Sequence, residues 1–300
     1  MNLPRRSRYA VLVVLLLACG FVVVLYPHRF QKYNSIELYE GNLADIRMDL
    51  RKPLDIQAFL GAVPYRKTQN YYYATLPREK YERSLLGGDG DCSNFSFGAA
   101  YYLLGRGIDF DIVHFLPADA LFSGDGHVAL RVPYLYRGRS GAGVLDPAGG
   151  GVPLAGGRVL DYPELPASAA MATFVQINNR ALPEYAGYYS ADYLRTVSIG
   201  ITPAAAVERY FRFIETIYLP FHKPRLEKML YDGMALLSGS YYPIYVDKAF
   251  FDRIRLEKYM FTGLLAAIRL FLALLLFCVV FDVFATLGRR LFRWTGVVRI

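Results

Sequence analysis

Two long apolar segments lie near the ends of the chain, and a more polar stretch separates them. Residues 9–26 (YAVLVVLLLACGFVVVLY) carry no charge, and residues 260–287 form a second apolar run that only Arg269 and Asp282 interrupt. A helix rises about 1.5 Å per residue and a bilayer core is about 30 Å thick, so each segment is long enough to cross most or all of a membrane. The pattern predicts two transmembrane helices on either side of residues 29–258.

The first apolar segment has alternatives to an uncleaved anchor. Arg5 and Arg6 before an apolar run are typical of a secretory signal peptide, but the run continues through residues 21–25, where a polar cleavage region is expected. Residues 16–19 (LLAC) resemble a lipoprotein processing box, although the second leucine is bulky and the mature end would begin with apolar residues. For residues 260–287 the alternative is a buried core helix. The length of that run and the basic cluster after it favour a second span.

The polar middle begins with signals for a helix followed by strands. Residues 94–104 (NFSFGAAYYLL) have the three-to-four spacing of a helix, with Asp91 as its N-cap and two glycines as its end. Strands are expected at residues 110–116, 128–136 and 141–145, where apolar and polar positions alternate.

The rest of the middle has a different character. Beyond residue 160 the helix signals increase and tyrosines become frequent. We therefore expect a first domain over residues 29–160 and a helical, tyrosine-rich extension over residues 161–258.

Charge is concentrated beside the apolar segments. The net charge of +8 arises from three arginines before residue 29 and five after residue 258, so the middle holds 26 basic and 25 acidic residues. A nearly neutral middle argues against a nucleic-acid surface. Short arginine-rich flanks favour the cytoplasmic side of a membrane, which predicts cytoplasmic tails at residues 1–8 and 288–300. The middle would then lie outside the cytoplasm, in a periplasm where the cell has one.

Cys92 is the only thiol of the middle region, because Cys19 and Cys278 fall inside the apolar segments. No disulfide can form within the predicted outer domain, although a periplasm would permit one. Cys92 lies in the run GDCSNF, next to polar residues and glycine. A buried structural thiol is the simplest alternative, but this context favours a reactive one.

His127 and Asp146 follow Cys92 in an order that supplies a base and a group to orient it. A thiol attacks as the thiolate, which the start of a helix and a neighbouring imidazolium both stabilise. On its strand His127 shares a face with Ala129 and Arg131, opposite the apolar face that we expect to form the core. Asp146 is expected to accept a hydrogen bond from Nδ1–H of His127, as in a catalytic triad. The Cys92 N–H is a candidate oxyanion donor.

Each member of the series also has a plain structural interpretation. His127 can be an ordinary hydrogen-bonded histidine, and Asp146 before a proline can be a turn residue. His114 is the rival base, but it lies among apolar strand residues and is expected in the core. Asp89 and Asp91 lack the spacing of a calcium loop, and one cysteine with one histidine does not fill a zinc site. We therefore expect neither a metal nor a cofactor.

Four short motifs in residues 90–147 occur in the order and spacing of a known family. They are Gly90-Asp91-Cys92, Leu103-Leu104-Gly105-Arg106-Gly107-Ile108, Gly126-His127-Val128 and Leu145-Asp146-Pro147. Together they resemble the transglutaminase-like superfamily of the papain-like fold group. The first motif is also similar to bacterial transglutaminase-like cysteine proteinases, some of which cut periplasmic proteins.

The resemblance implies an α+β fold in which a helix bearing Cys92 packs on an antiparallel sheet bearing His127 and Asp146. It also implies a Cys-His-Asp enzyme that cleaves or transfers an amide or ester acyl group. With the two spans, the expected protein is a thiol hydrolase or acyltransferase of the inner membrane that acts on an envelope protein or peptide. The alternatives are a non-catalytic scaffold of the same fold in an envelope assembly and, less well supported, a two-span transporter subunit.

Overall fold

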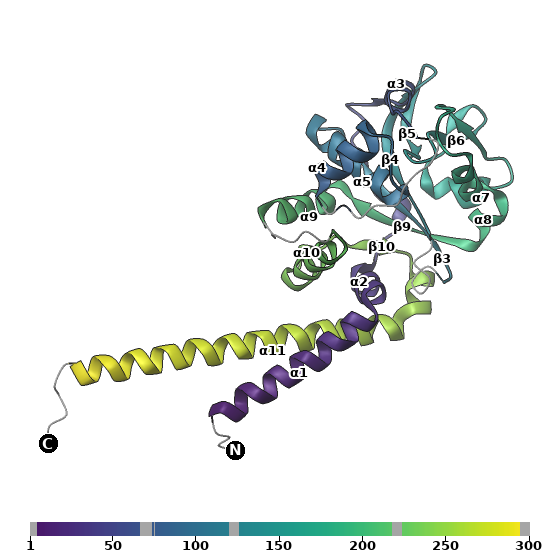
Figure 1. Cartoon of the computed structure of the whole chain (residues 1–300). Coiled ribbons are helices and arrows are strands. Elements are labelled where there is room, and N and C mark those ends of the chain that lie inside the picture. The colour runs from purple at the N-terminus through teal and green to yellow at the C-terminus, as the bar shows by residue number, and fades with distance from the viewer. Residues whose placement is uncertain (1–4, 67–73, 75, 120–125, 218–223, 295–300) are drawn as a thin grey trace.

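The computed structural model describes residues 5–66, 74, 76–119, 126–217 and 224–294. Figure 1 shows a globular domain from which two long helices, one near each end of the chain, leave on the same side. The domain combines helices with a mixed β-sheet, so the chain has an α+β fold.

The helices and strands follow one another along the whole chain. The α-helices are α1 (Arg5–Leu25), α2 (Pro27–Ser35), α3 (Ile56–Gly61), α4 (Pro77–Lys80), α5 (Cys92–Arg106), α7 (Leu165–Ser168), α8 (Ala191–Thr196), α9 (Ala204–Thr216), α10 (Pro224–Ser238) and α11 (Lys248–Trp294). Short 3₁₀ turns occur at η1 (Leu43–Asp45), η3 (Tyr162–Glu164) and η4 (Pro183–Tyr189), and η2 (Tyr81–Leu86) is a π-helix. The strands are β1 (Ile36–Leu38), β2 (Leu54–Asp55), β3 (Asp111–Pro117), β4 (His127–Tyr136), β5 (Arg139–Leu145), β6 (Gly151–Ala155), β7 (Arg158–Val159), β8 (Thr173–Gln176), β9 (Val197–Pro203) and β10 (Ile244–Val246).

The main sheet has the strand order β1-β10-β9-β3-β4-β2, and β5 also pairs with β4. The pairs that join β9, β3, β4 and β5 are antiparallel, as expected for the strands around His127. The sheet as a whole is mixed, because β1 pairs with β10 and β2 pairs with β4 in parallel. Both of these strands, β1 and β2, lie before Cys92 in the chain, whereas their partners β10 and β4 lie after it. Parallel neighbours require such long connections.

The sheet is buried on both faces. Leu130 and Val132 of β4 pack with Phe95 and Ala99 of α5 in the larger core, as the alternation along β4 predicts. The opposite face, which carries Ala129, forms a second core with β5, η3, α7 and α8. His127 belongs to this second face and therefore does not lie on the face that α5 covers.

Residues 161–258, expected as a helical extension, also contribute strands. β9 lies between β10 and β3 in the main sheet, and β8 pairs with β6 in a second sheet of order β7-β6-β8. The stretch therefore completes the same domain that carries Cys92. Its strands are short, three to seven residues, which leaves little periodic signal in the sequence.

α11 is the helix of the described chain that is by itself long and apolar enough to cross a membrane, over Lys248–Gly288. The first apolar segment passes the same test only when α1 and α2 are taken together, and these two helices are bent by 93°. Pro27 occupies the first turn of α2 and lacks the N–H that a continuous helix would need at this bend. By length and composition, the described residues thus contain one candidate span, or two if α1 and α2 together form a single bent span.

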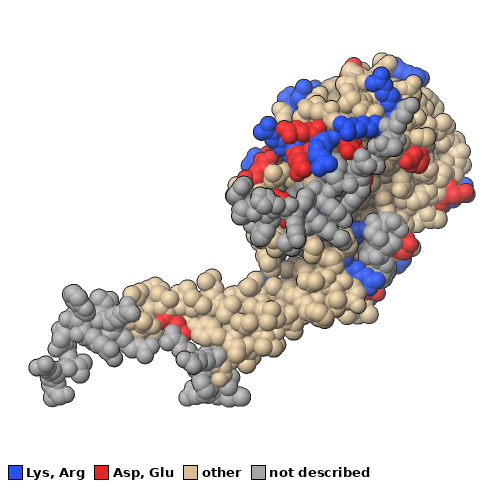
Figure 2. Space-filling model, viewed as in Figure 1, with Lys and Arg blue, Asp and Glu red and all other residues tan. Residues whose placement is uncertain are grey.

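The two apolar helices leave from one edge of the sheet and contact each other. β1 follows α2, β10 precedes α11, and these strands are paired neighbours. Val23 of α1 packs beside Leu265 of α11, and the Tyr9 hydroxyl donates a hydrogen bond to Asp282 near the other end of α1. In the view of Figure 2 the charged side chains gather on the globular domain, whereas the described parts of the long helices are almost uniformly uncharged.

Candidate functional site

Cys92 is the first residue of α5 and is half-buried. Asp91 is the N-cap, as predicted, because its Oδ1 accepts a hydrogen bond of 2.7 Å from the Asn94 N–H. Phe95 N–H bonds the Asp91 carbonyl, so the N–H groups of Cys92 and Ser93 have no acceptor within the helix. The helix starts two residues before the predicted boundary and brings its positive end to the thiol.

His127 is the first residue of β4 and lies opposite Phe115 of β3. Its side chain is completely buried among aromatic rings. The Tyr188 ring is stacked on the imidazole at 4.3 Å between centroids and 4° between planes, whereas Phe115, Tyr185 and Tyr189 stand at 5.6 to 5.9 Å and at larger angles. The second core therefore encloses the ring, while its position at the strand end keeps it near the start of α5.

Asp146 comes directly after β5 and is fully buried. Its Oδ2 lies 2.8 Å from Nε2 of His127, and its Oδ1 accepts hydrogen bonds from the N–H groups of Ala148 and Gly149 at 3.0 and 2.9 Å. The predicted Asp146–His127 pairing is present, but the expected ring nitrogen was wrong. The carboxylate approaches from the loop after β5 and meets Nε2, which leaves Nδ1 without a nitrogen or oxygen partner among the described residues.

The loop after Asp146 contains three consecutive glycines, Gly149 to Gly151, at positions where the packing leaves no room for a side chain. A Cβ on Gly149 would lie 3.0 Å from Oδ2 of Asp146 and 2.9 Å from the Phe174 ring, and one on Gly151 would lie 2.4 Å from a backbone oxygen of β8. Gly150 has φ +59°, a left-handed conformation that favours glycine. Larger residues here would displace the carboxylate from His127.

The electrostatics of the site follow from burial and proximity. Burial alone lowers the pKa of His127, but the charge and hydrogen bond of Asp146, together with the Cys92 thiol, outweigh it and raise the pKa to about 10. Burial, followed by the nearby thiol of Cys92, raises the pKa of Tyr185, and burial with the Asp146 carboxylate raises that of Tyr189. The site therefore combines an imidazolium, a carboxylate and neutral phenols around one thiol.

The His127–Asp146 pair predicts that folding depends on pH. The pKa of His127 is higher in the folded chain, so the folded state binds this proton more tightly. The stabilisation is complete below the unfolded value, about 6.5, and is lost as the pH rises through about 10. We expect the melting temperature of the wild type minus that of His127→Gln to fall between about pH 7 and pH 10, measured in detergent. A constant or growing difference would contradict this assignment.

His114, the rival base, does not meet the thiol. Its Nε2 lies 3.0 Å from Oγ1 of Thr202, whose own hydroxyl bonds the carbonyl of Pro243. Burial, with a smaller effect of Lys32, lowers the pKa of His114 to about 3, so this ring is neutral. It is a core histidine, as expected from its apolar neighbours along β3.

Sequence reasoning missed the tyrosines that surround His127. Tyr185, Tyr188 and Tyr189 lie on η4, far along the chain from the three residues that they enclose. The run PEYAGYYS is dense in tyrosine, and that density was the available signal. It carried no information on which ring would face the imidazole.

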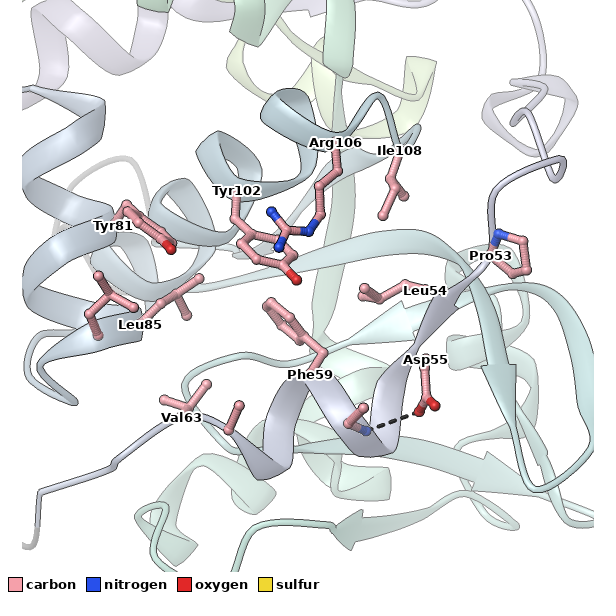
Figure 3. Close-up of a pocket in the computed structure, with 13 residues that line it drawn as sticks. Pro53, Leu54, Asp55, Phe59, Val63, Tyr81, Leu85, Tyr102, Arg106 and Ile108 are labelled. Carbon is pink, nitrogen blue, oxygen red and sulfur yellow. Dashed lines mark hydrogen bonds between the residues drawn. The ribbon is translucent and has the colours of Figure 1, made fainter.

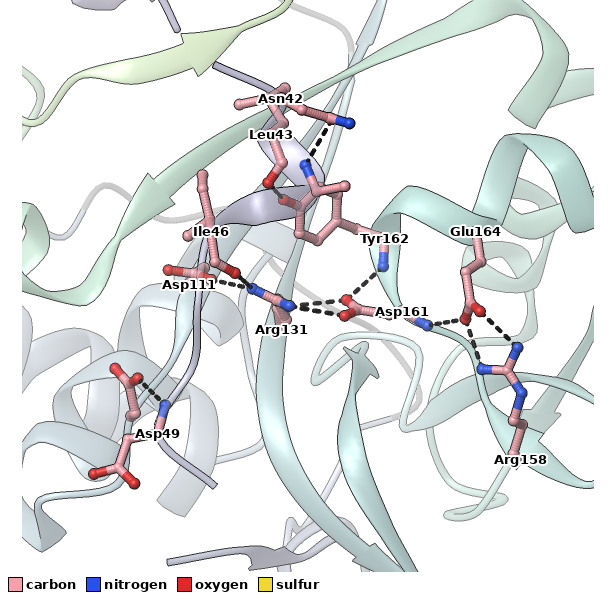
Figure 4. Close-up of polar contacts among 12 residues, drawn as sticks. Asn42, Leu43, Ile46, Asp49, Asp111, Arg131, Arg158, Asp161, Tyr162 and Glu164 are labelled. Carbon is pink, nitrogen blue, oxygen red and sulfur yellow. Dashed lines mark hydrogen bonds and ion pairs between the residues drawn. The ribbon is translucent and has the colours of Figure 1, made fainter. Parts of the chain in front are cut away.

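A buried ion network supports the strand that carries His127 (Figure 4). The Arg131 guanidinium donates to both carboxylate oxygens of Asp161 at 2.8 to 3.1 Å and to Asp111 at 3.2 Å, and it also bonds the Ile46 carbonyl at 2.7 Å. These contacts join β3, β4, the start of η3 and the segment after η1. Arg131 shares the face of His127, so the network anchors the second core beneath the site.

A separate cavity of about 330 Å³ lies between α3 and the far end of α5 (Figure 3). Its lining is mostly apolar, and the Arg106 guanidinium lies 4.0 Å from the centre of the Tyr102 ring. The lining comprises Pro53, Leu54, Asp55, Ala58, Phe59, Ala62, Val63, Tyr81, Leu85, Leu86, Tyr102, Arg106 and Ile108. Cys92 and His127 are not in it.

The described part of the chain contains no group of three or more histidine, cysteine or acidic side chains arranged to hold a metal ion. Comparisons with protein-family models, curated proteins and solved structures each found no match. The case for function therefore depends on the chemistry of the site itself.

Proposed function

We propose that the protein is a membrane-anchored thiol enzyme in which Cys92, His127 and Asp146 form a catalytic triad. One observation carries the proposal: a fully buried imidazole pairs with a carboxylate at 2.8 Å, and the Cys92 thiol at the start of α5 is close enough to contribute to the raised pKa of that imidazole. Buried ion pairs of this kind are costly to maintain in a fold, and perturbed titratable groups cluster at catalytic sites.

The chemistry is acyl transfer through a thioester. The Cys92 sulfur, as the thiolate beside the imidazolium, attacks an amide or ester carbonyl carbon, and the carbonyl electrons move to oxygen. His127 then donates its proton to the leaving nitrogen or oxygen, the bond to that atom breaks, and an acyl-Cys92 thioester remains. Water, or an amine acceptor, attacks the thioester while His127 removes its proton, and the sulfur leaves as the thiolate.

Two further groups have roles in this scheme. Asp146 keeps the imidazole in orientation and stabilises its positive charge, because its other oxygen is fixed by two backbone N–H groups. The free N–H of Cys92 is suited to bind the oxyanion that forms during attack. Peptide-bond cleavage is our preferred outcome, and transfer to an amine differs only in the acceptor.

The proposed architecture is a transglutaminase-like, papain-like core between two membrane spans. It is supported by the Cys-bearing helix on an antiparallel β3-β4-β5 unit and by the four motifs of residues 90–147. Two spans are supported by the pairing of Tyr9, next to the N-terminal arginines, with Asp282, which precedes the C-terminal arginines. The domain is then periplasmic and both tails are cytoplasmic. The proposed substrate is a protein or peptide of the cell envelope.

Thiol labelling tests both the enzyme and its orientation. We expect a membrane-impermeant iodoacetamide derivative to label the full chain in intact spheroplasts, at Cys92, because Cys19 and Cys278 lie within apolar helices. At pH 6 the reaction should be about a hundredfold faster than that of a model thiol, since a neighbouring imidazolium and the start of a helix both favour the reactive thiolate. Cys92→Ala should abolish the labelling.

The outcomes of this experiment are distinct. Labelling that requires permeabilised membranes would exclude the periplasmic orientation. Labelling of Cys92 no faster than a model thiol, together with a normal phenotype for Cys92→Ala, would exclude the enzyme and favour a non-catalytic scaffold.

A further inference from the structure

The face of the His127 ring is covered by one side chain. The Tyr188 ring lies nearly parallel to the imidazole, at 4.3 Å and 4°, while the other neighbouring rings are tilted or edge-on. Tyr188 is itself half-buried, and Tyr193 packs edge-on against it at 5.1 Å and 77°. The arrangement places the face of an aromatic ring directly against the imidazole of His127.

Such stacking has two physical consequences. The electron-rich face of an aromatic ring attracts a cation, so a stacked tyrosine favours the imidazolium over the neutral imidazole. It also restrains the imidazole from turning out of the plane in which Nε2 lies 2.8 Å from Oδ2 of Asp146. The hydrogen bond to Asp146 fixes one atom of the ring, and the stacked face fixes the tilt about that atom.

We propose that Tyr188 is a positioning residue of this site, which holds the plane of His127 and favours its protonated form. This inference rests on the proposed function. The titratable groups that face His127 are Cys92 from α5, Asp146 from the loop after β5, and Tyr185 and Tyr189 from η4. Tyr188 differs from them because the plane of its ring lies parallel to the plane of the imidazole and in contact with it.

The test is a histidine titration by NMR on the full chain in detergent, with His127 assigned by the loss of its signal in His127→Gln. Tyr188→Phe keeps the ring face and should leave the midpoint of His127 within about 0.3 pH units, whereas Tyr188→Leu removes it and should lower the midpoint by about one unit. Tyr101→Leu is the matched control, because Tyr101 is also half-buried but contacts Tyr81 and Phe211 instead of His127. It should titrate like the wild type.

An unchanged His127 midpoint in Tyr188→Leu would overturn the proposal, as would an equal shift in Tyr188→Phe. If Tyr188→Leu does not fold, Tyr188→Met replaces the ring by an unbranched apolar chain and has the same expected result. The titration does not depend on catalysis: if Cys92 of the wild type proves unreactive, the proposed function fails while the His127 midpoints still decide the role of Tyr188. If Cys92 is reactive, its rate of alkylation against pH should shift with Tyr188→Leu and not with Tyr188→Phe.

Discussion

Replacing His127 by alanine is expected to slow alkylation of Cys92 by iodoacetamide at pH 6 by about a hundredfold. Without the imidazolium, the thiol loses the neighbouring positive charge that favours its reactive thiolate form. Turnover of any amide or ester substrate should fall further, by about 10⁴-fold, because proton transfer to the leaving group is lost as well. The measurement is the second-order rate constant of alkylation at pH 6, compared between the wild type and the variant.

His114→Gln is the matched control for this result. It removes the other buried histidine of the domain's central strands, whose ring bonds Thr202 and not the thiol. We expect its alkylation rate at Cys92 to equal that of the wild type, although its stability should fall. A large loss of rate in His114→Gln, or none in His127→Ala, would contradict the assignment of the base.

Replacing Arg131 by methionine is expected to destabilise the domain by about 3–5 kcal/mol at neutral pH, because it leaves the buried carboxylate of Asp111 and the partly buried carboxylate of Asp161 without a counter-charge. Burial raises the pKa of Asp111 to about 6 even though Arg131 opposes it, so removal of the arginine should raise this pKa further. An acid with a raised folded-state pKa stabilises the fold at low pH and loses that contribution as the pH rises. The deficit should therefore be smaller at pH 5 than at pH 8, as measured by chemical unfolding in detergent.

Arg158→Met provides the comparison on the surface. Arg158 bonds Glu164 at 2.6 Å, but the two side chains are 49% and 37% exposed, so solvent screens the pair. We expect a loss of less than about 1 kcal/mol with little dependence on pH. Equal losses in the two variants would show that the buried network around Arg131 has no special role.

Much of the candidate site was accessible from local sequence patterns. An aspartate N-cap and a three-to-four apolar spacing predicted a helix beside Cys92, and the helix begins at that residue. Alternation placed His127 and Arg131 on one face of a strand, and both belong to the same buried face. These features depend on neighbours a few positions away, so a sequence records them directly.

Other features depend on residues that are distant along the chain. Alternation identified one core face of β4, but the opposite face was expected to be open to the helix end and is instead covered by elements after residue 160. The parallel edge strands come from segments whose few residues hold no strong period. Burial of both faces required the whole domain to be assembled.

The sequence by itself determined two apolar segments with basic flanks, an α+β middle, and a thiol, an imidazole and a carboxylate in a meaningful order. These properties follow from composition and from spacings within single helices and strands. Only the tertiary structure decided that Asp146 bonds Nε2 of His127, that His114 bonds the Thr202 hydroxyl, and that the Tyr188 ring stacks on the imidazole. The reason is physical: the orientation and environment of a buried ring depend on how distant segments pack around it, which no local spacing records.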